Sequence, residues 1–223
     1  MRVLGIDCGT EYTGYGIVDL LAEGRNSDGR ANDRRNNDRR ANDRLVCIVC
    51  GAIQVSPRDP MPTRLSLISI GLQELISRHS PDRVAIEDVF YAANVKSALK
   101  LGQVRGVAML AAASAGLEVA EYSPLSIKSA VVGYGRAEKH QVQQMVMRLL
   151  NLDQIPEPAD AADALAIAIC HLHTAATRER QSPANGEANR DLGRDSKYSP
   201  CHPERSSPSR LRGEPRSRKT PTP

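Results

Sequence analysis

The stretch that decides the fold is MRVLGIDCGTEYTGYG, residues 1–16. Its apolar residues Val3, Leu4 and Ile6 predict a buried strand, and that strand ends in one acid, Asp7. A carboxylate at the tip of a buried strand is costly unless a cation compensates it. Aspartate is also common in ordinary strand-end turns, so this stretch alone leaves a structural and a functional interpretation open.

Glycines follow this acid at Gly9, Gly14 and Gly16. Glycine lets the backbone turn tightly or lets a ligand approach the backbone closely. The sequence therefore predicts either a tight turn or a ligand next to Asp7.

Carboxylates occur in comparable settings at two other places in the chain. Residues 84–86 predict a short buried strand that ends in Glu87. Residues 159–168 predict an alanine-rich helix in which Asp160 and Asp163, three positions apart, share one face. So apolar a helix is expected to be mostly buried, and its acids must then face something specific.

The four acids Asp7, Glu87, Asp160 and Asp163 are the candidate catalytic and metal-binding residues. If they converged, they would repel one another and raise one another's pKa unless a cation were present. Ligand sets made only of oxygen suit Mg²⁺, with Mn²⁺ as a substitute. Such clusters hold two ions ~3.5–4 Å apart in phosphodiester hydrolysis, so we expect two ions per subunit.

The order of the predicted elements indicates an α/β fold. Strands are expected at residues 3–6, 13–20, 45–55, 84–86 and 117–122. Helices are expected at residues 65–77, 94–115, 124–133, 138–150 and 159–168. Three strands in a row favour antiparallel pairing, and the later crossovers favour parallel pairing. We therefore expect a five-stranded mixed sheet with helices on both faces.

Two segments are expected to be disordered and to flank or interrupt one domain, residues 1–177. Residues 22–44 form an Arg/Asp-rich insertion whose five-residue blocks lack apolar side chains, and residues 178–223 form a basic tail. The tail contains 11 of the 30 Lys/Arg residues and 6 of the 26 Asp/Glu residues. The insertion contains 7 Lys/Arg and 5 Asp/Glu residues. The remaining 12 and 15 give the domain a net charge of −3, so the overall charge of +4 is weak support for nucleic-acid binding by the domain.

Composition also bears on the compartment. Five scattered cysteines do not predict a disulfide framework, and Cys47 and Cys50 have the spacing of half a zinc site but favour packing beside an apolar strand. The apolar run before Asp7 is too short for a secretory signal, and no apolar stretch is long enough to cross a membrane. A cytoplasmic location without membrane contact is expected.

Five separated motifs together resemble the RuvC family of Holliday-junction resolvases, within the RNase H/integrase-like superfamily. They are GIDCG with TGYG (5–9 and 13–16), AIEDVF (85–90), SP with Lys128 (123–128), VGYG with AEK (132–139) and DAADALA (160–166). The resemblance covers residues 1–20 and 45–175. It implies an RNase H-like fold and a crossover junction endodeoxyribonuclease in which Asp7, Glu87, Asp160 and Asp163 bind the metal.

The resemblance also implies how such an enzyme acts. A homodimer would nick two opposing strands of a four-way DNA junction, leaving 5′-phosphate and 3′-hydroxyl ends, in recombination and repair. Phe90 matches an aromatic residue that stacks on bases, and Lys128 and Lys139 match basic residues that contact phosphate. Arg136 belongs to the same local basic cluster. A branch-migration complex of the RuvA and RuvB type is the implied partner. Cys8 departs from the proline usual in this family.

Three alternatives remain open from the sequence. Residues 5–10, GIDCGT, match the first phosphate loop of actin-like ATPases and sugar kinases nearly as well, although a second such hairpin is not found. A junction-independent RNase H-like nuclease is the second alternative. A catalytically silent DNA-binding protein is the third, and the presence of all four acids disfavours it.

Overall fold

The computed structural model describes residues 1–22, 43–88 and 95–181. The chain divides into a compact unit, Met1–Pro183, and a second unit, Ala184–Pro223, which lies outside the described residues. The predicted insertion at 22–44 falls almost wholly outside them as well, although the flanking strands include residues 22, 43 and 44.

A single mixed sheet of five strands forms the centre of the compact unit, in the order β3-β2-β1-β4-β5. The strands are β1 (Arg2–Asp7), β2 (Tyr12–Ala22), β3 (Asp43–Gln54), β4 (Arg83–Glu87) and β5 (Val119–Tyr122). The β1–β2 and β2–β3 pairs are antiparallel, whereas β1–β4 and β4–β5 are parallel. The predicted mixed sheet is confirmed, because the opening meander and the later crossovers give the expected directions.

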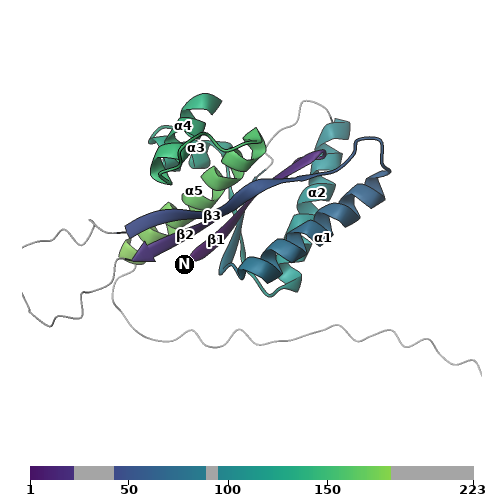
Figure 1. Ribbon diagram of the computed structural model, residues 1–223, viewed down its shortest axis with the longest axis horizontal. Coiled ribbons are helices and arrows are strands. Elements are labelled where there is room, and N and C mark those ends of the chain that lie inside the picture. Colours follow the sequence, from purple (N-terminus) through teal and green to yellow (C-terminus); the bar gives the residue numbers. More distant parts are fainter. Residues whose placement is uncertain (23–42, 89–94, 182–223) are drawn as a thin grey trace, which may run out of the picture. The chain divides into compact units, whose positions relative to one another are not determined.

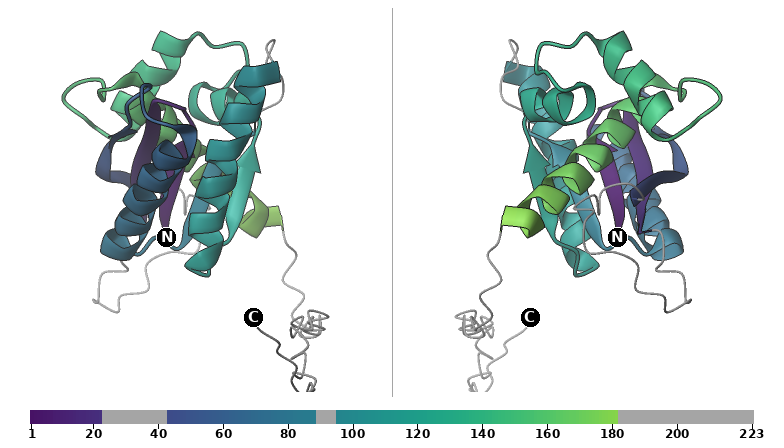
Figure 2. Two further views of the ribbon diagram at one scale, coloured as in Figure 1. Left: turned by 90° about the vertical axis from the view of Figure 1, so that its right-hand side faces the viewer. Right: turned by 90° about the vertical axis from the view of Figure 1, so that its left-hand side faces the viewer.

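Five helices cover the two faces of this sheet. They are α1 (Met61–His79), α2 (Val95–Ser114), α3 (Pro124–Val132), α4 (Lys139–Leu149) and α5 (Ala159–Gln181). Helices α1 and α2 lie on one face, and α3, α4 and α5 lie on the other (Figures 1 and 2). The prediction of helices on both faces is therefore confirmed.

The side chains of β1 alternate between these two layers. Val3 packs with the α3–α5 layer, whereas Leu4 and Ile6 pack with the α1–α2 layer, and all three side chains are fully buried. Because strand side chains alternate with a period of two, Gly5 and Asp7 share the α5 side with Val3. Burial of both faces explains why this strand is an uninterrupted apolar run.

Glycines let α5 lie directly against the sheet. A Cβ atom on Gly5 would lie 2.0 Å from the Ala164 carbonyl oxygen, and one on Gly14 would lie 2.1 Å from the Asp160 carbonyl oxygen. A Cβ atom on Gly16 would lie 2.8 Å from the Leu165 side chain. This corrects the expectation that Gly14 and Gly16 serve a turn or a ligand, because the backbone of a helix makes the close approach instead.

Local sequence signals set the ends of several helices. Ser123 accepts a hydrogen bond from the Ser126 amide and Pro124 follows it, so the expected start of α3 is confirmed. Helix α5 continues past residue 177 to Gln181, so residues 178–181 do not belong to a disordered tail as predicted. Arg178, Glu179 and Arg180 are good helix formers, which accounts for the extension. No helix in the described ranges has the length and apolar character needed to span a bilayer.

Candidate active site

The register of two parallel strands places the first two acids together. Ile6 of β1 pairs with Ile86 of β4, so Asp7 and Glu87 are neighbours at the carboxyl ends of these strands. Each acid lies two positions after an α5-facing residue, because Gly5 lies opposite Ala85 and Ala85 packs in the α5 layer. Their side chains therefore point toward the same helix layer.

Helix α5 brings the other two acids to this edge. Asp7 is the partner of Gly14 in the β1–β2 ladder, and the Asp160 backbone rests on that glycine. Asp163 lies one turn further along the same helix. The close contact between α5 and the glycines is thus what places the acids of residues 160–163 near Asp7.

A cavity of about 210 Å³ opens at this edge. Its charged lining consists of three acids and two lysines: Asp7, Glu87, Asp163, Lys128 and Lys139. Its apolar wall comes from α3, α4 and α5 and consists of Pro124, Ile127, Val142, Ala166 and Ile167. Asp160 does not line the cavity, although its charge acts on Asp7.

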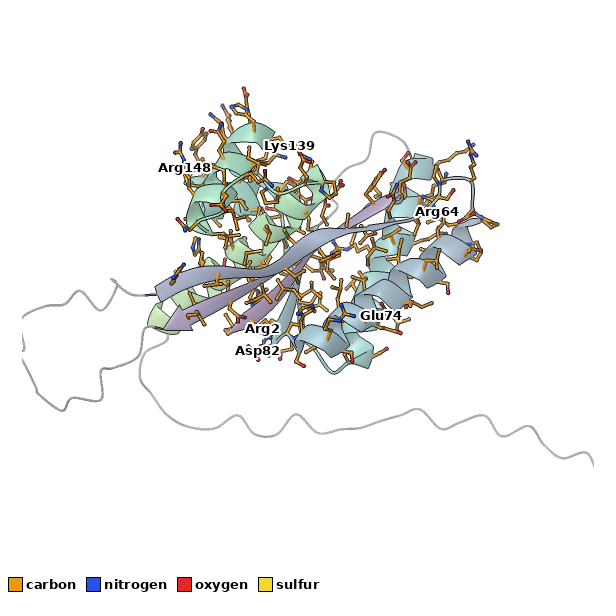
Figure 3. All side chains as sticks on the ribbon, in the orientation of Figure 1. Arg2, Arg64, Glu74, Asp82, Lys139 and Arg148 are labelled. Atoms are coloured by element: carbon orange, nitrogen blue, oxygen red, sulfur yellow. The ribbon has the colours of Figure 1, made fainter. Side chains whose placement is uncertain are left out.

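Lys139 forms an ion pair with one of these acids. Its Nζ donates to Asp163 Oδ2 at 2.5 Å, from the first residue of α4 to the first turns of α5. Figure 3 shows Lys139 in the α3–α4–α5 layer. This contact raises the pKa of Lys139, chiefly through the hydrogen bond with Asp163. The lysine therefore keeps its charge while it faces the carboxylates.

The carboxylates perturb one another. Burial, followed by the charges of Asp163, Glu87 and Asp160, raises the pKa of Asp7 from 3.8 to about 7. Burial and the charge of Asp163 also raise the pKa of Glu87, against the opposing effect of Lys128 and Lys139. The cavity therefore holds more negative charge than its two lysines neutralise.

The stability of the metal-free protein is expected to depend on the protonation of Asp7. Its carboxyl group keeps its proton up to about pH 7 in the folded protein, whereas the unfolded chain releases it near 3.8. The folded state then binds more protons in this window, so the free energy of unfolding falls as the pH rises from about 4 to about 7. Comparison with Asp7→Asn isolates this effect, because the variant lacks the titrating group.

Urea unfolding in the presence of a chelator measures this difference. Between pH 4 and pH 7, the free energy of unfolding of the variant should rise by on the order of 3 kcal/mol relative to that of the wild type. Parallel stability curves for the two proteins between pH 4 and 8 would contradict the proposed burial of an uncompensated Asp7 carboxylate.

The donor set fits a divalent cation. It offers only carboxylate oxygens, which are ligands suited to a hard cation such as Mg²⁺. Burial and the neighbouring acids raise the pKa of Asp7, an effect that a bound cation would oppose. Within the described residues, however, no three His, Cys, Asp or Glu side chains lie close enough together to hold one ion. The Asp163 carboxylate forms an ion pair with the Lys139 ammonium instead. The four-acid metal site therefore stays a prediction.

Only some of the predicted DNA-contacting residues line the cavity. Lys128 and Lys139 both line the cavity. Arg136 is exposed in the connection between α3 and α4, and it is not part of the cavity lining. Phe90 lies outside the described residues, two positions beyond Asp88.

Arg105 is a residue that the sequence analysis missed. From α2 its guanidinium donates to the backbone carbonyl of Glu87 and to the Glu121 carboxylate, and it lies 3.6 Å from the Asp88 carboxylate. These contacts connect the carboxyl ends of β4 and β5 to α2. The only sequence signal was a basic side chain on a largely apolar helix, which does not identify its partners.

Comparison with known proteins agrees with this geometry. The RuvC family model, described as crossover junction endodeoxyribonuclease RuvC, matches residues 38–171. The crossover junction endodeoxyribonuclease RuvC of Koribacter versatilis is 62% identical over 180 residues, which cover 81% of this chain and 97% of that protein. The chain belongs to the RuvC family of crossover junction endodeoxyribonucleases.

Solved structures show the same fold. Thermus thermophilus RuvC superposes with a TM-score of 0.67 at 31% identity, over 80% of this chain and 97% of that one. T. thermophilus RuvC in complex with a Holliday junction substrate matches with a TM-score of 0.66 at 28% identity, over 79% and 96% of the two chains. The five-stranded mixed sheet with its helices is accordingly an RNase H-like fold, as expected.

Proposed function

We propose that this protein resolves four-way DNA junctions by nicking two opposing strands at the cavity between β1, β4 and α5. The observation that carries the proposal is the cavity lining, in which three carboxylates meet two lysines in a chain of the RuvC family. Phosphodiester hydrolysis needs both kinds of charge, because anionic phosphate must be attracted while cations are held beside it. The products would carry 5′-phosphate and 3′-hydroxyl ends.

Each group in the cavity has a distinct role in this proposal. Asp7, Glu87 and Asp163, with Asp160 beside them, would hold Mg²⁺, or Mn²⁺ in its place. When bound, the divalent ions would activate the attacking water and neutralise the leaving oxygen. Lys128, on the cavity wall, positions the phosphate from the α3 side.

Lys139 has a second role that follows from its ion pair. With no metal present, its ammonium neutralises part of the charge on Asp163. On metal binding, the carboxylate would turn to the ion, and the released lysine would contact the phosphate backbone. The lysine side chain is well exposed, which leaves it room to move.

One assay distinguishes this function from the alternatives that the sequence leaves open. We expect nicking of a synthetic four-way junction in Mg²⁺, with linear duplex of the same sequence largely spared. ATP hydrolysis without junction cleavage would favour the kinase-like alternative. Equal cleavage of duplex and junction would favour a junction-independent nuclease, and junction binding without cleavage would favour the silent DNA-binding protein.

Two such sites acting together require a homodimer, and α2 offers a suitable surface. Val95, Leu99 and Leu110 are 72%, 65% and 65% exposed, and helical spacing puts them in one stripe with Gly102 and Gly106. Apart from the nearby backbone of α2 itself, no atom of the described residues lies within 4 Å of a Cβ built on either glycine. The described part of the chain thus does not pack against these two glycines, and we propose that this stripe packs against a second copy.

A charge placed in the middle of this stripe should separate the subunits. We expect Leu99→Asp to weaken dimerisation at least about a hundredfold, because the carboxylate would be buried without a partner. Sedimentation velocity of both proteins over a range of concentrations measures this effect. Leu67→Asp is the matched control, since Leu67 is 45% exposed and belongs to α1, which does not contribute to the stripe. A monomeric wild type, or an equally dimeric Leu99→Asp, would reject α2 as the interface.

Two further expectations remain part of the proposal. A branch-migration complex of the RuvA and RuvB type would deliver the junction to the dimer. Such a reaction on DNA fits a cytoplasmic location.

A further inference from the structure

A β-bulge places two cysteines on the same face of β3. Val49 lies opposite Ile17 and Cys47 lies opposite Val18, so Ile48 is an extra residue in the ladder. In a regular strand, residues three apart point to opposite faces. Here the extra residue shifts the alternation of side chains by one position, so Cys47 and Cys50 both face α5.

Packing agrees with this register. Cys47 and Cys50 both pack against the core under α5, whereas Val49 between them packs against the core under α1 and α2. Ile48 itself is 39% exposed. Cys47 and Cys50 are each half buried, so neither residue is enclosed in the core.

The two thiols are hydrogen-bonded to each other. Cys47 S–H donates to Cys50, which lowers the pKa of Cys50 from 9.0 to about 7 and raises that of Cys47. The other described cysteines lack such a neighbour, and burial is the main cause that raises the pKa of Cys8 and that of Cys170. Among these thiols, Cys50 therefore has the largest fraction of thiolate near neutral pH, which is the nucleophilic form.

We propose that Cys47 and Cys50 form a dithiol site that undergoes exchange with low-molecular-weight disulfides such as oxidised glutathione. A metal centre is not favoured, because among the described residues no third His, Cys, Asp or Glu joins the pair in a metal-binding group. Two ligands alone do not complete a zinc site, which takes four.

The exchange takes place in two steps. The Cys50 thiolate attacks one sulfur of the small disulfide, a mixed disulfide forms at Cys50, and one glutathione leaves as a thiolate that takes up a proton. Cys47 then loses its proton and attacks Cys50 Sγ, which releases the second glutathione. The protein loses two hydrogens and two electrons, and the small disulfide is reduced to two thiols.

The disulfide would bridge the bulge and fix it. The bulge separates two parts of the β2–β3 ladder: residues 12–17 with 49–54, beside the candidate active site, and residues 18–22 with 43–47. Oxidation would therefore set the register of the edge strand next to Gly14, without contact with the four acids.

Mass spectrometry of the reduced full-length protein tests this site, in a Cys201→Ser background that removes the remaining thiol. After treatment with oxidised glutathione at pH 7, acid quenching and alkylation, the tryptic peptide 45–58 should be two hydrogens lighter and unalkylated. Cys8 and Cys170 should react at least about tenfold more slowly. Equal rates at Cys8 and Cys50, or a mixed disulfide that never closes, would overturn the proposal.

Serine variants assign the two roles. In Cys47→Ser, the glutathione adduct should accumulate on Cys50, because no resolving thiol remains. In Cys50→Ser, Cys47 should react at least about tenfold more slowly than Cys50 does in Cys47→Ser. Equal reactivity in the two variants would overturn the assignment. If either variant fails to fold, iodoacetamide alkylation rates of the wild-type thiols between pH 6 and 9 give the same ranking.

Discussion

Replacement of Asp7 by asparagine is expected to abolish junction cleavage while junction binding is preserved. The amide has nearly the shape of the carboxylate, but it removes one negative charge from the acids that would hold the metal. Cleavage in Mg²⁺ should fall at least about a thousandfold, equivalent to ~4 kcal/mol of transition-state stabilisation. Binding should change less than about threefold, because Lys128 and Lys139 remain on the cavity wall.

Two measurements on one protein preparation distinguish this result from misfolding. A gel-shift titration with a labelled four-way junction and a chelator gives binding, and single-turnover nicking after Mg²⁺ addition gives the cleavage rate. Asp153→Asn is the matched control, since Asp153 is exposed in the connection between α4 and α5. An unchanged nicking rate in Asp7→Asn would remove this acid from the site, and the metal-binding proposal would fail with it.

The neighbouring positions of Asp7 and Glu87 were predictable from the sequence, because both acids end short apolar strands. Parallel strands joined by a crossover end at the same edge of a sheet. The pairing of Ile6 with Ile86 places the ends of these two strands side by side. Local signals of this kind depend on a few adjacent residues, so they can be recognised without the fold.

The position of α5 was not predictable in the same way. Asp160 and Asp163 were recognised as a pair, but their approach to Asp7 depends on contacts between residues more than 140 positions apart, such as Gly14 with Asp160. Glycine has no side chain that could indicate a helix as its neighbour. The ion pair of Lys139 with Asp163 likewise depends on the packing of α4 on α5.

The bulge in β3 is a further feature that the sequence did not reveal. The spacing of Cys47 and Cys50 suggests opposite faces of a regular strand, and only the extra residue Ile48 reverses this. A bulge depends on the partner strand as much as on its own residues, so the residues of β3 alone could not predict it.

Replacement of Gly14 by alanine is expected to disrupt both the fold and the site. The new methyl carbon would lie 2.1 Å from the Asp160 carbonyl oxygen and 2.6 Å from its carbonyl carbon. Backbone atoms cannot move aside as a flexible side chain can, so the start of α5 must shift away from β2. Overpacking of this kind costs roughly 3 kcal/mol, and displacement of a catalytic group by ~1 Å can cost about a hundredfold in rate.

Thermal unfolding should therefore show a clear loss of stability for Gly14→Ala, and nicking should be about a hundredfold slower at temperatures where the variant is still folded. Ser66→Ala is the matched stability control. Because Ser66 is exposed on α1 and belongs to neither the site nor the stripe on α2, alanine there should change the free energy of unfolding by less than about 1 kcal/mol. If Gly14→Ala kept both the wild-type unfolding temperature and the wild-type nicking rate, close contact between α5 and the sheet could not be what positions Asp160 and Asp163 beside Asp7.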